Sequence, residues 1–128
     1  MLFRSLIAQA YSPTAPGALN AAFRTVYKNK YRKEPPQFTA QAFTAVQVMV
    51  EALRALDKRE KIVNMELAEV RVKLNAQILI GKYNTPLGEI SFDKEGEINQ
   101  KNFYVAQIKM IRGDSSDVFA GKFTYVKF

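Results

Sequence analysis

The segment that most constrains the fold of this chain is residues 40–56, with the sequence AQAFTAVQVMVEALRAL. Its pattern predicts an α-helix, and Thr39 is placed to cap the N-terminus. Apolar residues fall on almost every side of this helix rather than on one face. Such a helix is stable in water only when neighbours enclose it from several directions. The segment therefore belongs to a layered structure with apolar partners on more than one side.

The surrounding segments predict two further helices and a few short strands. Residues 6–11 predict a strand that runs into a turn-rich loop, and residues 18–33 predict a helix that ends at a pair of prolines. Residues 65–80 predict a third helix that ends at Gly81. One weak strand cannot cover three helices. We therefore expect an α/β fold with an incomplete sheet, whose parallel strands lie outside these residues, and a large apolar patch on the isolated chain.

A hairpin motif follows the third helix. Ile90 and Phe92 alternate with polar residues over residues 88–92, which predicts a strand. The next four residues, Asp-Lys-Glu-Gly, predict a tight turn in which Gly96 takes a positive φ. A longer strand follows, and its alternation places on one face Tyr104, Ala106, Ile108 and Met110. After a polar turn, residues 118–128 predict a final strand.

Composition argues against an enzyme. The 128 residues include neither Cys nor His, so thiolate chemistry and the usual neutral-pH acid or base have no residues to use. We predict no catalytic activity, no cofactor and no metal site. No apolar run approaches the roughly 18 residues that span a bilayer, and the first ten residues lack the apolar centre of a signal peptide. The net charge of +7 fits either a soluble surface or an anionic partner.

These motifs, in this order, resemble the type I periplasmic solute-binding proteins, in the leucine-binding-protein-like branch that serves ABC transporters for branched-chain amino acids and amides. The similar features are a Tyr-Ser-Pro loop at residues 11–13, Phe-Thr-Ala-Gln-Ala-Phe at residues 38–43, and the hairpin from Thr85-Pro86-Leu87-Gly88 to Gly96. Relatives often carry Tyr-Asp-Ala where this chain has Phe43-Thr44-Ala45. The resemblance extends over about residues 6–126 and corresponds to the C-terminal part of a family member.

The resemblance implies a fragment of an extracytoplasmic receptor, periplasmic in a bacterium with two membranes. Two α/β lobes close around a branched-chain or other neutral amino acid, or an amide, and the closed form docks on an ABC transporter permease in the membrane. In that architecture residues 1–5 are a junction or truncated start, and residues 6–99 complete the first lobe. Residues 100–128 cross the hinge and form C-terminal strands, with residues 100–103 as the candidate crossing.

The resemblance also supplies two candidate ligand contacts. Phe38 matches a position that can lie against the side chain of the ligand, at the N-terminus of the long helix. A core phenylalanine that staples the start of the helix explains the same residue equally well. Tyr11 is the second candidate, because it follows a strand and ligands of open α/β sheets bind outside the carboxyl ends of strands. Most ligand contacts of the family come from earlier segments that have no counterpart in this chain.

Other functions explain single features of the chain. A small nucleic-acid-binding module is the alternative, because residues 24–33 interleave basic and aromatic residues. The tyrosines there fall on the apolar stripe of the helix, however, and acidic residues dilute the basic surface, so we predict no nucleic-acid partner. Asp93, Glu95 and Glu97 gather at a turn that could hold Ca²⁺, although the EF-hand spacing is absent. The tripeptide Arg112-Gly113-Asp114 matches a cell-adhesion motif, and a turn explains it as well.

Overall fold

The computed structural model describes residues 5–111 and 120–126. The elements in chain order are β1 (Ser5–Gln9), α1 (Ala18–Tyr31), α2 (Gln37–Arg59), the 3₁₀ turn η1 (Ile62–Asn64), α3 (Leu67–Ile80), β2 (Lys82–Thr85), β3 (Gly88–Phe92), β4 (Ile98–Gln100), β5 (Tyr104–Ile111) and β6 (Ala120–Val126). The tripeptide at residues 112–114, and all but residue 5 of the predicted junction, lie outside the described residues. The predicted order of one strand, three helices and then strands is confirmed.

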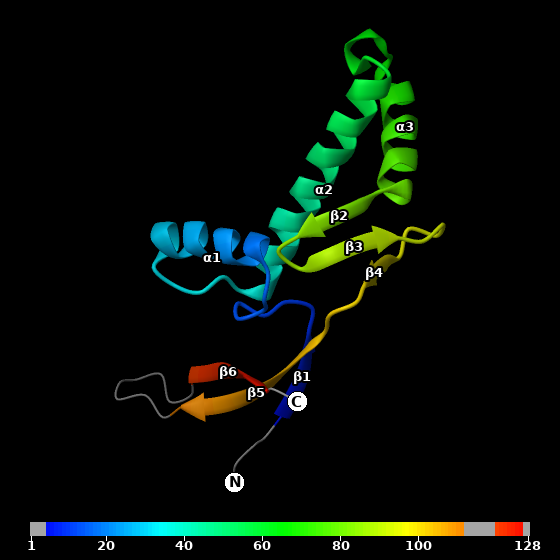
Figure 1. Ribbon diagram of the computed structural model, residues 1–128. Coiled ribbons are helices and arrows are strands. Elements are labelled where there is room, and N and C mark those ends of the chain that lie inside the picture. The colour runs from blue at the N-terminus through cyan, green and yellow to red at the C-terminus, as the bar shows by residue number, and fades with distance from the viewer. Residues whose placement is uncertain (1–4, 112–119, 127–128) are drawn as a thin grey trace.

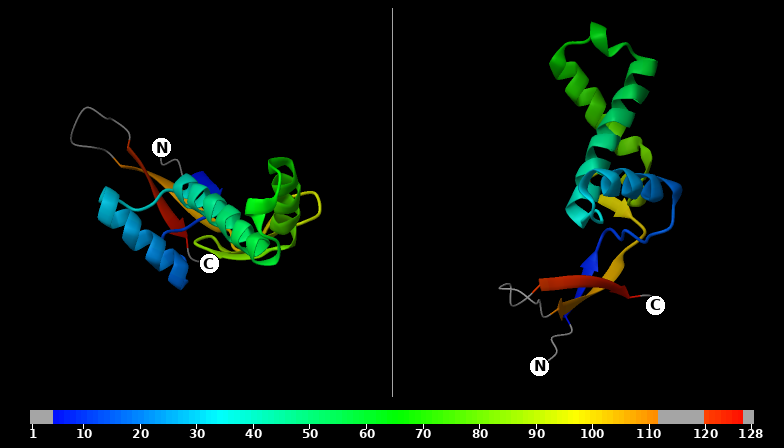
Figure 2. Two further views of the ribbon diagram at one scale, coloured as in Figure 1. Left: turned by 90° about the horizontal axis from the view of Figure 1, so that it is seen from above. Right: turned by 90° about the vertical axis from the view of Figure 1, so that its left-hand side faces the viewer.

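The elements gather into two bodies, which two extended connections join (Figure 1). The helical body contains α1–α3 and the antiparallel sheet β2-β3-β4, and the strand body is the antiparallel sheet β1-β5-β6. Figure 2 shows the same separation from two further directions. The turn after β3 leads into the short β4, which pairs with β3, and not directly into the long strand as predicted. The long strand, β5, pairs with β1 instead. Within the described ranges, every strand pair is antiparallel.

The pairing of β1 with β5 joins the two ends of the chain. It extends from Ser5 opposite Ile108 to Gln9 opposite Tyr104. Residues 5–9 therefore share a sheet with the C-terminal strands and not with the helices that follow them. The predicted boundary at residue 100 falls between the two bodies, where β4 ends. The assignment of the bodies to lobes of a receptor stays a prediction.

The helix α2 is buried along one stripe only. This stripe consists of every fourth residue of the helix, and its members are Ala40, Thr44, Val48, Ala52 and Leu56. Three of them belong to a core cluster with residues of β2, β3 and the turn between them, Tyr83, Leu87 and Ile90. Much of the rest of the helix is open, with Phe43 exposed at 48% and Val46 at 56%. The described residues therefore enclose α2 from one side, although its sequence is apolar on almost all sides.

The ends of the helices correct two expectations. Thr39 is not the cap of α2, because the helix begins at Gln37 and the carbonyl of Pro36 accepts hydrogen bonds from the amides of Thr39 and Ala40. Pro36 has an extended backbone, with φ −74° and ψ 162°, which sets the start of the helix directly after it. The first helix ends at Tyr31, since Arg32 adopts the left-handed conformation with φ 57°.

Gly81 lies at the end of α3, as the sequence predicts, but for a different reason. Its φ is −77°, so no left-handed cap is formed. A Cβ atom at this position would overlap the ring and hydroxyl of Tyr83. The single hydrogen of that hydroxyl is shared between the carbonyls of Gln77 and Ile78, at 3.3 and 3.2 Å, and so serves two of the free carbonyls in the last turn of α3. Gly81 is therefore needed to make room for Tyr83.

We expect Gly81→Ala to destabilise the chain by about 1–3 kcal/mol, because the added methyl group displaces Tyr83 from the end of α3. Chemical denaturation followed by circular dichroism measures the change. The control is a double-mutant cycle with Tyr83→Leu, which removes the ring that blocks the methyl group. Equal effects of Gly81→Ala with and without the tyrosine would contradict this explanation.

Candidate functional site

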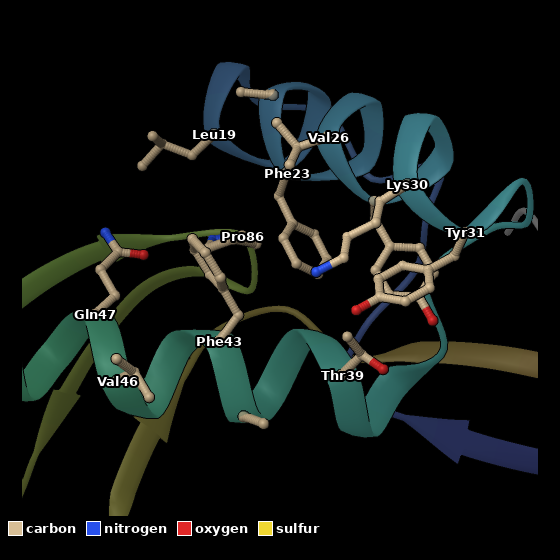
Figure 3. A pocket seen from close by; sticks show the side chains of 13 residues that line it. Leu19, Phe23, Val26, Lys30, Tyr31, Thr39, Phe43, Val46, Gln47 and Pro86 are labelled. Carbon is tan, nitrogen blue, oxygen red and sulfur yellow. The ribbon is translucent and has the colours of Figure 1, made fainter.

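An open apolar groove lies between α1 and α2, with a volume of about 760 Å³ (Figure 3). Phe23 of α1 and Phe43 of α2 point toward one another across it, with ring centroids 5.0 Å apart. The apolar stripe of the first helix lines the groove, and its members are Leu19, Ala22, Phe23, Val26, Tyr27 and Tyr31. Of these six side chains only Phe23 is buried. The stripe is thus paired with α2 on one side and uncovered on the other.

The groove has few groups that could hold a charged solute. Its lining contains one cation, Lys30, and no carboxylate. The ammonium of Lys30 lies 5.2 Å from the centre of the Tyr31 ring, in a cation–π arrangement. The amide of Gln47 already donates to Glu51 and to the carbonyl of Asn84, each at 2.8 Å. This groove therefore fits another apolar surface rather than the zwitterionic head of an amino acid.

Phe38 stands in the first turn of α2 with 79% of its surface exposed. It does not staple the start of the helix to the core of the described residues. A ligand contact by Phe38 remains a prediction. The neighbouring Gln37 is half-buried, and its side-chain oxygen accepts a hydrogen bond from the amide of Ala10 at 2.8 Å. The turn that presents Phe38 is thereby tied to the end of β1.

Tyr11 is fully buried, in contrast to Phe38. Its hydroxyl donates to Oδ1 of Asn20 at 2.9 Å, and its ring packs edge-on against Phe23. Asn20 in turn donates to the carbonyls of the loop that follows Tyr11, most closely to Ala15 at 2.8 Å. Burial raises the pKa of Tyr11 to about 12. The structure gives Tyr11 a place in the core of the helical body, and a ligand contact by it remains a prediction.

The acidic hairpin turn that follows β3 is stabilised by its own first residue. Oδ1 of Asp93 accepts hydrogen bonds from the amides of Glu95 and Glu97, at 3.0 and 2.8 Å. Gly96 has φ 87°, which confirms the predicted tight turn. In the part of the chain that the structure describes, no group of acidic residues is arranged to hold a metal ion. Within the same part, each helix is too short or too polar to span a membrane.

One surface ion pair anchors the loop between α1 and α2. The guanidinium of Arg24 contacts both carboxylate oxygens of Glu34, at 2.6 and 2.7 Å, and Lys28 adds a third contact at 2.8 Å. The hydrogen bonds from Arg24, assisted by those from Lys28, lower the pKa of Glu34 from its usual 4.5 to about 2. The pair holds the loop that leads through two prolines to Phe38.

Because the pKa of Glu34 is lower in the folded chain than in the unfolded one, its stabilising effect is complete above about pH 4.5 and is lost as the pH falls toward 2. The partners are 36% and 41% exposed, so solvent screening keeps the effect below about 1 kcal/mol. We expect Glu34→Gln to lower the unfolding free energy by up to that amount at pH 7 and to have a much smaller effect near pH 2, where about half of the Glu34 carboxyl is protonated in the folded chain. Denaturant titrations at both pH values measure this, with Glu95→Gln as the exposed control. An effect of equal size at both pH values would contradict the assignment.

The comparisons with known proteins place this fold. The periplasmic binding protein family model matches residues 4–116. Three similar solved structures are substrate- or solute-binding proteins of ABC transporters. The one from Desulfitobacterium hafniense, in complex with Leu, has 18% identity and a TM-score of 0.66, and the match covers 94% of this chain and 30% of that one. The one from R. palustris, with benzoate, has 21% identity, a TM-score of 0.68 and coverages of 96% and 29%, and the one from Rhodopseudomonas palustris BisB5, with 3,4-dihydroxy benzoic acid, has 26% identity, a TM-score of 0.64 and coverages of 97% and 32%. A search of curated protein sequences found no match.

These findings define a substrate-binding fold of the ABC-transporter type, of which this chain forms a part. The chain belongs to the periplasmic binding protein family. It spans about 30% of the length of the solved structures that it resembles. Most of each solved structure therefore has no counterpart in these 128 residues.

Proposed function

We propose that these residues form part of an extracytoplasmic receptor that captures a neutral amino acid or an amide and delivers it to an ABC transporter permease. The observation that carries the proposal is the family match over residues 4–116. Two solved relatives of this fold are a leucine complex and a leucine-binding protein from Thermotoga maritima. The open groove supports the proposal, since its apolar lining suits the sheet of a complete lobe and not a free solute.

In this receptor Phe38 lies against the side chain of the solute. The support for this contact is that the aromatic ring is exposed and lies at the N-terminus of α2, beside the junction of the two bodies. The groups that fix the charged ends of the solute come from other segments, because the carboxylate of Glu34, on the loop before Phe38, is already paired with Arg24 and Lys28. The chain therefore contributes a wall of the cleft and its connections, and the specificity arises from shape and from a few polar groups elsewhere.

An aromatic carboxylate is a second candidate for the solute. The structure with 26% identity is a complex with 3,4-dihydroxy benzoic acid, and another similar structure holds benzoate. An exposed phenylalanine ring suits the face of an aromatic solute, because offset or edge-on aromatic pairs add to the apolar contact. The rest of the receptor is the same for both candidates, and only the solute that contacts Phe38 differs.

Calorimetric titration of the receptor that contains this segment tests the proposal and separates the two solutes. We expect leucine to bind to this receptor. Phe38→Ala should weaken the affinity for leucine by about tenfold, and Phe38→Leu should weaken it much less, because an aliphatic contact is kept. If benzoate is the solute, Phe38→Leu should weaken binding nearly as much as Phe38→Ala, because the aromatic pair is lost. The 128 residues alone should release no heat with leucine. Tight leucine binding by this chain alone would overturn the proposal.

The open groove should make the isolated chain associate with itself. We expect its weight-average mass to rise with concentration in analytical ultracentrifugation, because the exposed apolar surface is removed from water on contact. Val46→Glu, at a groove residue 56% exposed, should weaken this association by about tenfold. Val63→Glu is the control, since Val63 is 84% exposed and lies outside the groove. Equal effects of the two substitutions would show that the groove does not direct the association.

A further inference from the structure

The residue Ala10 stands where the first connection leaves the strand body. It follows β1 directly and precedes Tyr11 and Ser12, which are buried in the helical body. The amide of Ala10 donates to Oε1 of Gln37 at 2.8 Å, and the carbonyl of Ala10 accepts from Nε2 of Gln100 at 2.6 Å. The two glutamines come from the start of α2 and the end of β4. Both peptide groups that flank the Cα of Ala10 are therefore held by the helical body.

The amide of Gln100 also reaches the second connection. Its nitrogen donates to the carbonyl of Asn102 at 2.9 Å as well as to Ala10. Since a side-chain amide has two N–H groups, each connection receives one of them. The two connections meet in this region between the bodies (Figure 1). One amide group thus joins the only two connections visible between the described parts of the bodies.

These bonds restrict where the chain can bend. A rotation about φ or ψ of Ala10 would displace one of its two held peptide groups and break a hydrogen bond. The strand body begins immediately beyond, where Gln9 pairs with Tyr104. In the second connection Lys101, Asn102 and Phe103 are exposed. The angle between the bodies therefore depends on Ala10 and residues 101–103, and the glutamines restrain both.

We propose that Gln37 and Gln100 are positioning residues that form a hinge clamp and set the angle between the helical body and the strand body. The clamp stands on the geometry of this chain alone. Its role in receptor closure rests on the proposed function: Gln37 directly precedes Phe38, so a change in the angle at Ala10 is coupled to the turn that presents this ring. Closure then requires the hydrogen bonds of the clamp to be strained or to be exchanged for others, since hinges absorb motion at a few residues.

The two glutamines should differ in their tolerance of glutamate. Toward the described residues, Gln37 uses its oxygen alone, so Gln37→Glu keeps an acceptor for the amide of Ala10. Toward the same residues Gln100 uses its nitrogen alone, so Gln100→Glu removes both donors and places a carboxylate oxygen beside two carbonyls. A loss of general polarity at the junction would affect the two positions alike. The contrast between them therefore identifies the clamp.

Distances between two spin labels, one on each body, measure the angle directly. The chain has no Cys, so Asn29→Cys on α1 and Thr124→Cys on β6 give unique labelling sites, and dilution into unlabelled chain suppresses distances between copies. We expect similar narrow distributions for the unmodified chain and for Gln37→Glu, and broader distributions for Gln37→Leu, Gln100→Leu and Gln100→Glu. Gln41→Leu, one turn further along α2, is the matched control. Narrow distributions for both Gln100 variants, or broadening by Gln41→Leu alone, would overturn the clamp.

Hydrogen–deuterium exchange gives a second measurement that does not depend on the labels. Exchange at the amide of Ala10 should be about tenfold faster in Gln37→Leu and unchanged in Gln37→Glu. Equal exchange in the unmodified chain and in Gln37→Leu would overturn the clamp. Neither measurement uses a solute. A failure of leucine and benzoate to bind the receptor would therefore reject the proposed function and leave the clamp standing.

Discussion

The packing of α2 is the constraint on which the rest of the structure depends. Its buried stripe repeats every four residues and holds the hairpin of β2 and β3 against the helix. The residues of the opposite side, among them Phe43, Val46 and Met49, are equally apolar and are exposed. Burial of such side chains stabilises a fold by roughly 1.5–3 kcal/mol each. A sequence that keeps them on both sides of one helix is suited to a layer between two others.

The fold could be predicted from the sequence where local signals agree. The helical periodicity, the prolines after α1 and the Asp-Lys-Glu-Gly turn after β3 each act within a few residues, and the structure keeps all three. The prediction for Thr39 is wrong because two cap signals compete there. A threonine oxygen suits an N-cap, but Pro36 fixes the extended conformation earlier and the helix starts at once. The stronger backbone restriction decides the start.

The rest could not be predicted because its causes lie far apart in the sequence. The pairing of β1 with β5 joins segments at opposite ends of the chain, and neither strand carries a mark of its partner. The bond from Gln100 to Ala10 spans 90 residues, and nothing in either neighbourhood distinguishes this glutamine from Gln41 or Gln107. The place of Tyr11 after a strand suggests a cleft residue. Its hydroxyl instead meets Asn20, whose apolar surroundings in the helix give no sign of this role.

The turn that presents Phe38 is determined by this chain, whereas the partner of the groove beside α2 is not. Phe38 is presented by a turn with three separate restraints: the ion pair of Glu34, the two prolines, and the bond between Gln37 and Ala10. These restraints fix the backbone of the turn and not the exposed ring, so they reduce only the backbone freedom that the turn could lose on contact with a partner. The described residues do not determine the partner, since the lining of the groove beside α2 offers one cation, Lys30, and no carboxylate. In the receptor proposed above, the segment would supply a restrained turn and an apolar wall, and the recognition of polar groups would come from other segments.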